Sequence, residues 1–350
     1  MMNYYDNCIY KEEIEKIVKG NPFIKALMGK SIVITGARGL IGSMLVDTIL
    51  YANKILGLEC RVYGVVRNMM KAMVRFAEYE SNEKFQLIKA DINSDDIQLD
   101  MDIDYFIHGA SNTHPIYYAS RPIETIRTNT LGTDRTLSFA AKHNCKRYLF
   151  LSSVEIYGEN RGDKEKFTED YCGYIDSNTL RAGYPEGKRV GECLCQAYRK
   201  EFGIDCVIAR VARCYGAGLL QEDSKALTQF IRKAANGEDI ILKSEGKQLY
   251  SYAYVTDVVD AVLFLLGKGE NGESYNVVSK ESDISLKELA SLIAKEKNRK
   301  VVFKLPDKIE ADGYSKATKA LLDGNKLSSL GWRSQYTIED GIKKVLEMME

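Results

Sequence analysis

The chain has 350 residues, in which 49 lysines and arginines balance 49 aspartates and glutamates. This length allows one large domain or two smaller ones, and the balanced charge argues against nucleic acid as a partner. The eight cysteines have no Cys-x-x-Cys spacing and mostly lie in apolar runs. They predict buried free thiols in a reducing cytoplasm, with neither a disulfide framework nor a metal site.

The amino-terminal region predicts no targeting or membrane segment. It has no basic region followed by an apolar one, and no later run reaches the roughly 18 apolar residues that a membrane span needs. We therefore expect a cytoplasmic protein with no membrane partner. Residues 10–19 predict a short amphipathic helix within an N-terminal helical extension over residues 1–29.

A glycine-rich turn follows the first predicted strand, Ser31–Thr35, and opens an apolar-periodic helix. Glycines let the backbone approach a pyrophosphate, and the helix amino terminus offers it free N–H groups. Strand, turn and helix in this order favour a dinucleotide site over a plain turn. The candidate cofactor residues here are Gly36, Arg38, Gly39, Leu40, Ile41 and Gly42.

The second and third predicted strands add candidates for the adenosine end of the cofactor. Residues 61–66 are followed by Arg67, where an acid would bind the ribose hydroxyls. An arginine there accepts a 2′-phosphate or stacks on adenine, so Arg67 leaves NADP open beside NAD. The strand over 85–90 leads to Asp91 and Ile92, and the aspartate is placed to meet the adenine amino group.

The alternation of strands and helices continues through the middle of the chain. Strands are expected over 103–110, 147–153 and 206–212, with a helix over 123–142. This alternation predicts an α/β fold, a Rossmann-like doubly wound parallel sheet with helices on both faces.

The chain becomes more mixed after residue 216. We expect residues 30–215 to form an NAD(P)-binding domain, with a later contribution near 250–265, and residues 216–350 to form mainly a smaller mixed α/β substrate lobe. The cleft between them is the expected substrate site. The elements predicted in the lobe are helices over 224–236, 257–267, 285–297 and 337–349 and strands over 240–243 and 274–278.

Tyr184 and Lys188 are spaced to share one face of a helix, about one turn apart. A tyrosinate at neutral pH needs a pKa shift of roughly three units, about 4 kcal/mol, and a lysine ammonium and a positive nicotinamide ring both favour the anion. With Ser153 at the end of an earlier strand, these residues form a device that removes a hydride and a proton from a carbinol. Tyr184 is the expected base, Lys188 lowers its pKa and holds ribose hydroxyls, and Ser153 binds the reacting oxygen. The alternatives are a boundary tyrosine beside a solvated lysine, and a serine that caps a turn.

Together these motifs resemble the extended short-chain dehydrogenases, in the nucleotide-sugar epimerase/dehydratase family. The resemblance covers about residue 30 to the end, and within the family it is greatest to UDP-glucuronate decarboxylases. The stretches that carry it are residues 35–42, 110–133, 152–158, 169–173 and 181–192.

The resemblance implies a redox-neutral cycle in which tightly held NAD⁺ oxidises the sugar C4 hydroxyl and later regains its oxidised form. A C4 ketone lies β to a carboxylate on C5, so carbon dioxide leaves with its electrons delocalised into the carbonyl. Glu155 matches a glutamate near C5 that moves a proton or orients the ring, its alternative being an exposed carboxylate before a turn. The resemblance also implies cofactor contacts for Ala110, a substrate contact for Thr113, and a homodimer. Asn129 is either the family's structural asparagine, counted with the cofactor residues, or a helix-surface amide.

Four positions depart from the decarboxylase pattern. Val154 stands where decarboxylases have a serine and 4,6-dehydratases an acid, which disfavours dehydration. Tyr250 replaces an arginine that grips the substrate, a loss of about 1.5–3 kcal/mol unless replaced. Arg213, at a usual asparagine, is positioned to supply that charge from another direction, and Arg67 replaces the usual acid.

We therefore expect an enzyme that oxidises C4 of a nucleotide sugar, in the manner of UDP-glucuronate decarboxylase. The alternatives are a nucleotide-sugar 4-epimerase or 4,6-dehydratase, an NADP-dependent reductase, and a non-catalytic nucleotide sensor.

Overall fold

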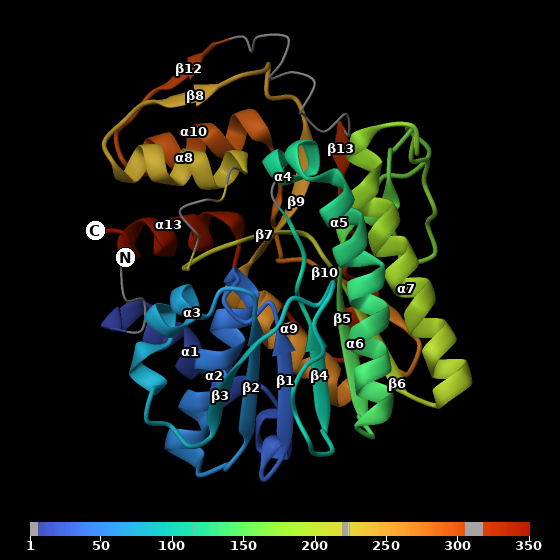
Figure 1. The fold of residues 1–350 in the computed structure, drawn as a ribbon. Coiled ribbons are helices and arrows are strands. Elements are labelled where there is room, and N and C mark those ends of the chain that lie inside the picture. Colours follow the sequence, from blue (N-terminus) through green and yellow to red (C-terminus); the bar gives the residue numbers. More distant parts are fainter. Residues whose placement is uncertain (1–5, 114, 219–222, 224, 305–317) are drawn as a thin grey trace.

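The computed structural model describes residues 6–113, 115–218, 223, 225–304 and 318–350. At its centre is a seven-stranded sheet of order β10-β6-β5-β4-β1-β2-β3, in which all neighbouring strands are parallel (Figure 1). This confirms the predicted doubly wound α/β fold. The strands are β1 (Ser31–Thr35), β2 (Arg61–Val66), β3 (Phe85–Lys89), β4 (Tyr105–His108), β5 (Arg147–Ser153), β6 (Asp205–Val211) and β10 (Ser274–Val277).

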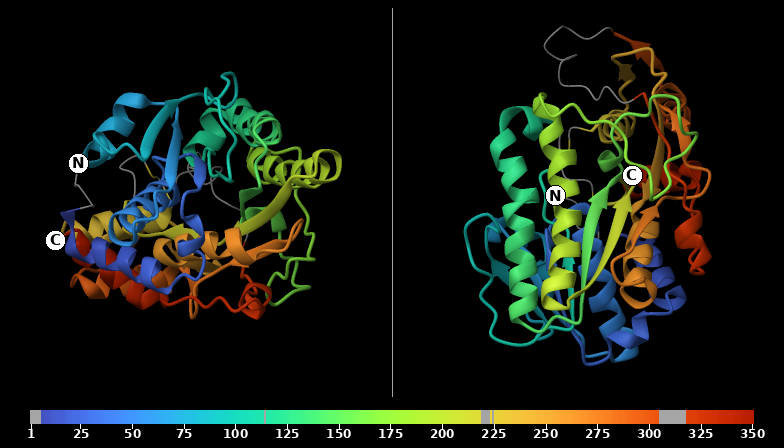
Figure 2. Two further views of the ribbon diagram at one scale, coloured as in Figure 1. Left: turned by 90° about the horizontal axis from the view of Figure 1, so that it is seen from below. Right: turned by 90° about the vertical axis from the view of Figure 1, so that its right-hand side faces the viewer.

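Helices cover both faces of this sheet, which explains the apolar character of its strands. Helices α6 (Leu131–Lys142) and α7 (Gly183–Phe202) stand on one side, and α2 (Leu40–Leu56) and α9 (Val255–Lys268) on the other (Figure 2). A parallel strand that is covered on both faces has no side exposed to solvent, so its residues do not alternate between apolar and polar. All five residues of β1 are accordingly buried.

Helix α1 (Cys8–Gly20) extends the expected 10–19 helix and packs on the second of these helix layers. Its amino end is capped by the Asn7 side chain, which accepts from two backbone N–H groups. Tyr10 Oη donates to Asp47 Oδ2 on α2 at 2.7 Å, and Asn21 Nδ2 donates to Asp260 Oδ1 on α9 at 2.8 Å. These buried hydrogen bonds fix the amino-terminal helix to the helices that support the sheet.

The helix expected over 123–142 is two helices, α5 (Pro122–Asn129) and α6, with a break at Thr130. Three consecutive side chains before and at the break, Thr128, Asn129 and Thr130, donate to carbonyls four residues earlier. Side chains that bond the helix backbone in this way bend or interrupt it. The apolar periodicity runs through the break and therefore gave no sign of it.

The later part of the chain builds smaller sheets above the carboxyl ends of the central strands (Figure 1). Predicted boundaries mostly agree within two residues, but β9 was not expected as a strand. Helix α9 packs on the central sheet near the expected residues 250–265, and β10, which was expected in the lobe, also joins that sheet. The elements are β7 (Arg213–Tyr215), α8 (Ala226–Ala235), β8 (Ile240–Leu242), β9 (Leu249–Tyr254), β11 (Asp283–Ser285), α10 (Leu286–Glu296), β12 (Val301–Phe303), β13 (Lys319–Ala320), α12 (Asn325–Ser329) and α13 (Ile338–Met348).

All eight cysteines are free, as expected, but they are not all buried. Cys60, Cys145, Cys195 and Cys206 are buried, whereas Cys8, Cys172 and Cys193 are exposed and Cys214 is intermediate. The prediction was wrong for the exposed thiols because a helix such as α7 has apolar residues on its solvent side as well. Within the described ranges, no helix is long and apolar enough to cross a bilayer, and no group of three or more metal-ligating side chains is present.

Candidate active site

A cavity of about 870 Å³ lies at the carboxyl ends of the central strands and is closed on its other side by α8, β8 and β9. It brings together every predicted site residue except Asn129. The predicted residues that line it are Gly36, Arg38, Gly39, Leu40, Ile41, Gly42, Arg67, Asp91, Ile92, Ala110, Thr113, Ser153, Glu155, Tyr184, Lys188, Arg213 and Tyr250.

The glycine-rich turn forms a cradle in which the backbone leaves no room for side chains at two of its glycines. Gly36 has a left-handed φ of 69°, and a Cβ built on it would lie 2.8 Å from the Gly109 carbonyl oxygen. A Cβ on Gly42 would lie 2.4 Å from the Gly36 oxygen. Helix α2 begins at Leu40, so its free N–H groups face the same cradle. The turn thus fits a dinucleotide pyrophosphate.

At the end of the cavity expected to hold the adenosine, Arg67 contacts two other polar side chains. Its Nη1 forms an ion pair with Glu124 Oε1 on α5 at 2.6 Å, and its Nη2 donates to Asn112 Oδ1 at 3.2 Å. Asp91 Oδ1 accepts from the Asn93 backbone N–H at 3.0 Å. An acid is therefore present near this end of the cavity, but it comes from α5 and not from the end of β2.

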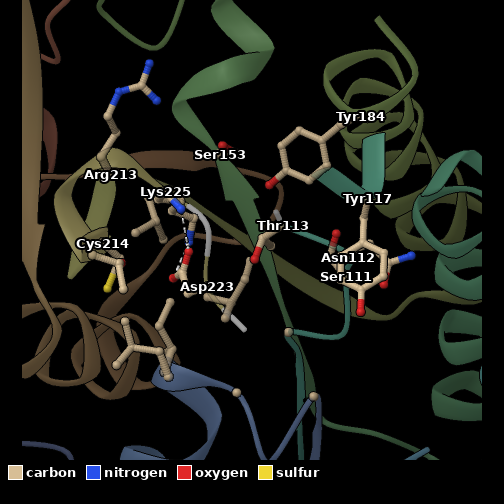
Figure 3. A pocket seen from close by; sticks show the side chains of 18 of the residues that line it. Ser111, Asn112, Thr113, Tyr117, Ser153, Tyr184, Arg213, Cys214, Asp223 and Lys225 are labelled. Atoms are coloured by element: carbon tan, nitrogen blue, oxygen red, sulfur yellow. Dashed lines mark hydrogen bonds and ion pairs between the residues drawn. The ribbon is translucent and has the colours of Figure 1, made fainter. Parts of the chain in front are cut away.

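Helix α7 places Tyr184 and Lys188 on its buried face. Figure 3 shows the Tyr184 hydroxyl directed toward Ser153 and Thr113. The Tyr184 ring stacks on Tyr118 with centroids 5.0 Å apart and an interplanar angle of 25°. Burial raises the pKa of Tyr184 to about 12, against the lowering effect of a hydrogen bond with Ser153.

Lys188 is buried beneath this tyrosine. Its Nζ donates to the Leu151 carbonyl oxygen at 2.8 Å and lies 4.7 Å from the centre of the Phe150 ring. Burial lowers the pKa of Lys188 to about 7. The expected lowering of the Tyr184 pKa is therefore not produced by the protein's own groups, because desolvation of the phenol outweighs the lowering effects of the Ser153 hydrogen bond and of Arg181.

Glu155 lies between two arginines. Arg181 Nη2 donates to one carboxylate oxygen at 2.9 Å, and Arg213 Nη1 donates to the other at 3.0 Å. Burial alone would raise the pKa of Glu155, but the two guanidiniums together lower it below its usual value. With a side chain only 18% exposed, Glu155 is not the solvent-facing carboxylate that was the alternative.

Arg213 also contacts Tyr250, the residue at the position of the missing arginine. The guanidinium carbon of Arg213 lies 3.8 Å from the centre of the Tyr250 ring. A guanidinium at this distance over an aromatic face is attracted to it. In Figure 3, Ser153 lies between Tyr184 and Arg213. Arg213 is on the same side of the view as Cys214 and the ion pair of Asp223 and Lys225.

Sequence reasoning gave no role to Tyr118 and Arg181. Arg181 lies over the Tyr118 ring at 4.7 Å while it bonds Glu155, so these two residues connect the Tyr184 ring to the Glu155 carboxylate. Arg181 lies three residues before Tyr184 in a quoted motif, and an arginine so close to the candidate base was the available signal. No sequence pattern indicated a role for Tyr118, because its position in the site depends on how α4 (Pro115–Ser120) packs.

Asn129 is buried and is not a helix-surface amide, so that alternative was wrong. Its Nδ2 donates to the Thr125 carbonyl oxygen, and its Oδ1 accepts from Ser111 Oγ, both at 2.8 Å. A Cβ on Gly187 would lie 2.8 Å from the Cβ of Asn129. Asn129 therefore packs against α7 between Tyr184 and Lys188, behind the cavity wall.

Comparison with known proteins agrees with this geometry. The model of the NAD dependent epimerase/dehydratase family matches residues 32–278. UDP-glucuronic acid decarboxylase 1 of Danio rerio is 30% identical over 320 residues, which cover 91% of this chain and 72% of that protein. UDP-glucuronic acid decarboxylase 6 of Arabidopsis thaliana is 29% identical, with coverage of 89% and 86%.

Solved structures share the fold. UDP-glucuronic acid 4-epimerase from Bacillus cereus, in complex with UDP-glucuronic acid and NAD, has a TM-score of 0.75 at 22% identity and covers 91% of this chain and 98% of its own. dTDP-glucose 4,6-dehydratase from Bacillus anthracis, in complex with NAD, has a TM-score of 0.74 at 19% identity, with coverage of 91% and 96%. A family match over most of the chain, a glycine cradle for the cofactor and a buried Tyr184 and Lys188 pair together place this protein in the NAD-dependent epimerase/dehydratase family of enzymes.

Proposed function

We propose that this enzyme oxidises the C4 hydroxyl of a nucleotide-linked sugar and, in the manner of its decarboxylase relatives, decarboxylates UDP-glucuronate. The observation that carries the proposal is the convergence of Tyr184, Ser153 and Glu155 on one cavity beside the cofactor cradle. The names of the relatives support UDP-glucuronate as the substrate.

In this proposal Tyr184 accepts the proton of the C4 hydroxyl, and Ser153 holds the oxygen from which it leaves. Bound NAD⁺ supplies the hydride acceptor and a positive ring charge that favours the tyrosinate. The Tyr118 ring, stacked on Tyr184, keeps water from one side of the phenol and fixes its direction. Lys188 is buried next to the base and is placed to hold the cofactor ribose.

The charge around Glu155 supports an anionic sugar. Two guanidiniums, of Arg181 and Arg213, face one carboxylate, which leaves one positive charge at this wall of the cavity. Within the described part of the chain, the buried Arg181 Nη1 and Arg213 Nε have no hydrogen-bond partner. A sugar carboxylate is the group that would balance this charge.

Dehydration at C5 and C6 is disfavoured on two grounds. Val154 is buried and apolar and has no proton to give to a departing hydroxyl. Glu155, whose pKa is lowered by its two arginines, is a weak base for removing a C5 proton. Epimerisation at C4 is the second candidate, because it needs Tyr184 and Ser153 but no acid or base at C5.

The test is mass spectrometry and NMR of the products after incubation with UDP-glucuronate, with and without added NAD⁺. A UDP-pentose or its 4-keto form supports decarboxylation. An unchanged mass with inverted C4 configuration supports epimerisation instead. If UDP-glucuronate is recovered unchanged under both conditions, the proposed substrate is withdrawn. UDP-glucose, which lacks the carboxylate, is the matched control substrate.

We also propose that the enzyme is a homodimer, as its resemblance to the epimerase/dehydratase family implies. Helices α5 and α7 pack side by side, and each carries exposed apolar residues, Ile123 and Ile126 on α5 and Val190 on α7. Light scattering after size-exclusion chromatography tests this proposal, and a monomer at micromolar concentration contradicts it.

A further inference from the structure

The adenosine end of the cavity contains a closed ring of three polar side chains from three parts of the chain. Arg67 follows β2, Asn112 follows β4, and Glu124 belongs to α5. Arg67 bonds both partners, and Asn112 Nδ2 also donates to Glu124 Oε1 at 3.3 Å. Two acceptors, which are hydrogen-bonded to each other, therefore fix the orientation of the Arg67 guanidinium.

The carboxylate in this ring is placed behind the arginine. Arg67 and Asn112 line the cavity, whereas Glu124 is not among its described lining residues. Burial tends to raise the pKa of Glu124, but the bonds from Arg67 and Asn112 lower it below its usual value. Glu124 is thus ionised at neutral pH and compensates the charge of Arg67 from outside the cavity.

We propose that Glu124 is the positioning residue that makes this enzyme select NAD over NADP, acting through Arg67. A 2′-phosphate that approached Arg67 would come close to the Glu124 carboxylate, and like charges at short distance repel. The uncharged ribose hydroxyls of NAD meet no such repulsion. Arg67 at the end of β2 would by itself favour NADP, but paired with Glu124 it favours NAD.

The charge at this site depends on Glu124. Without the carboxylate, the Arg67 guanidinium would present its positive charge to a 2′-phosphate. Removal of Glu124 alone should then be enough to shift the preference toward NADP.

The experiment is calorimetric titration of the full-length enzyme, freed of bound nucleotide, with NAD⁺ and with NADP⁺. The wild type should bind NAD⁺ more tightly. In Glu124→Gln the ratio of the two dissociation constants should move toward NADP⁺ by about fivefold or more, the size expected for a charge-assisted contact at a half-exposed site. Arg67→Ala added to Glu124→Gln should reverse that shift.

Two controls keep the outcome interpretable. Glu273→Gln removes an exposed ion pair with Lys326 away from the cavity, and it should leave the ratio unchanged. Arg67→Ala alone keeps the carboxylate and should weaken NADP⁺ further, which tests the proposal even if Glu124→Gln folds poorly. A wild type that prefers NADP⁺, or a folded Glu124→Gln with an unchanged ratio, overturns the proposal. Because the readout is cofactor binding, it is independent of which sugar the enzyme uses.

Discussion

Arg213 rests on the face of Tyr250, with its guanidinium carbon 3.8 Å from the ring centre. The ring orients the guanidinium so that one nitrogen reaches Glu155 at 3.0 Å. A tyrosine at the position of a substrate-binding arginine thus supports an arginine that arrives from β7. The positive charge is retained in the cavity, but it comes from another strand.

Arg213→Met should weaken the binding of UDP-glucuronate about tenfold or more, because a charge-assisted hydrogen bond is lost. Binding of UDP-glucose should change much less, since it carries no carboxylate. Calorimetry in a Tyr184→Phe background measures both affinities without turnover. An equal loss of affinity for the two ligands would show that Arg213 does not bind the carboxylate.

Glu155→Gln and Arg181→Met should move the acid limb of the activity profile in opposite directions. Glu155 raises the pKa of Tyr184, and Arg181 lowers it. If Tyr184 acts as the base, activity grows as the phenol ionises, so the limb shifts to lower pH in Glu155→Gln and to higher pH in Arg181→Met. The measurement is kcat/KM against pH. Shifts in the same direction would contradict the electrostatic account.

Tyr184→Phe should reduce kcat by about 10²–10⁴, the range for loss of a positioned acid or base. NAD⁺ binding should persist, because the ring and its stacking on Tyr118 are retained. Tyr198→Phe is the matched control, since Tyr198 lies on the same helix and bonds Asp134 at 2.7 Å, away from the cavity. Comparable losses in both variants would point to a structural effect on α7.

Lys188→Met should change how stability depends on pH. The folded pKa of Lys188 is lowered from 10.5 to about 7, so between these values the unfolded chain binds a proton that the folded chain does not. The unfolding free energy of the wild type, relative to the variant, should therefore rise with pH through this window. Urea unfolding at several pH values measures this difference, and Lys200→Met, on the exposed side of α7, should show no such trend. A difference that stays constant with pH would contradict the lowered pKa.

Gly191→Ala should destabilise the fold by about 1–3 kcal/mol through overpacking. A Cβ on Gly191 would lie 2.5 Å from Cζ of Phe150, the ring that faces Lys188. Gly20→Ala is the control, because a Cβ there meets nothing within 4 Å. Thermal unfolding of both variants measures the effect, and equal stability would mean that Phe150 moves aside without cost.

Local pattern alone was enough for much of this protein. The strand at 31–35, its glycine turn and the helix after it follow from periodicity and backbone geometry, which act over a few residues. The one-turn separation of Tyr184 and Lys188 is likewise a property of any helix. For this reason the parallel sheet, the cofactor cradle and the candidate base could all be predicted from the sequence.

The partners of those residues were decided by tertiary structure. Glu155 and Arg213 are 58 positions apart, and Arg67 and Glu124 are 57 apart. No periodicity relates such positions, and only the packing of strands and helices from different parts of the chain brings them together. The raised pKa of Tyr184 has the same origin, because desolvation depends on everything packed around the phenol and not on the lysine one turn away.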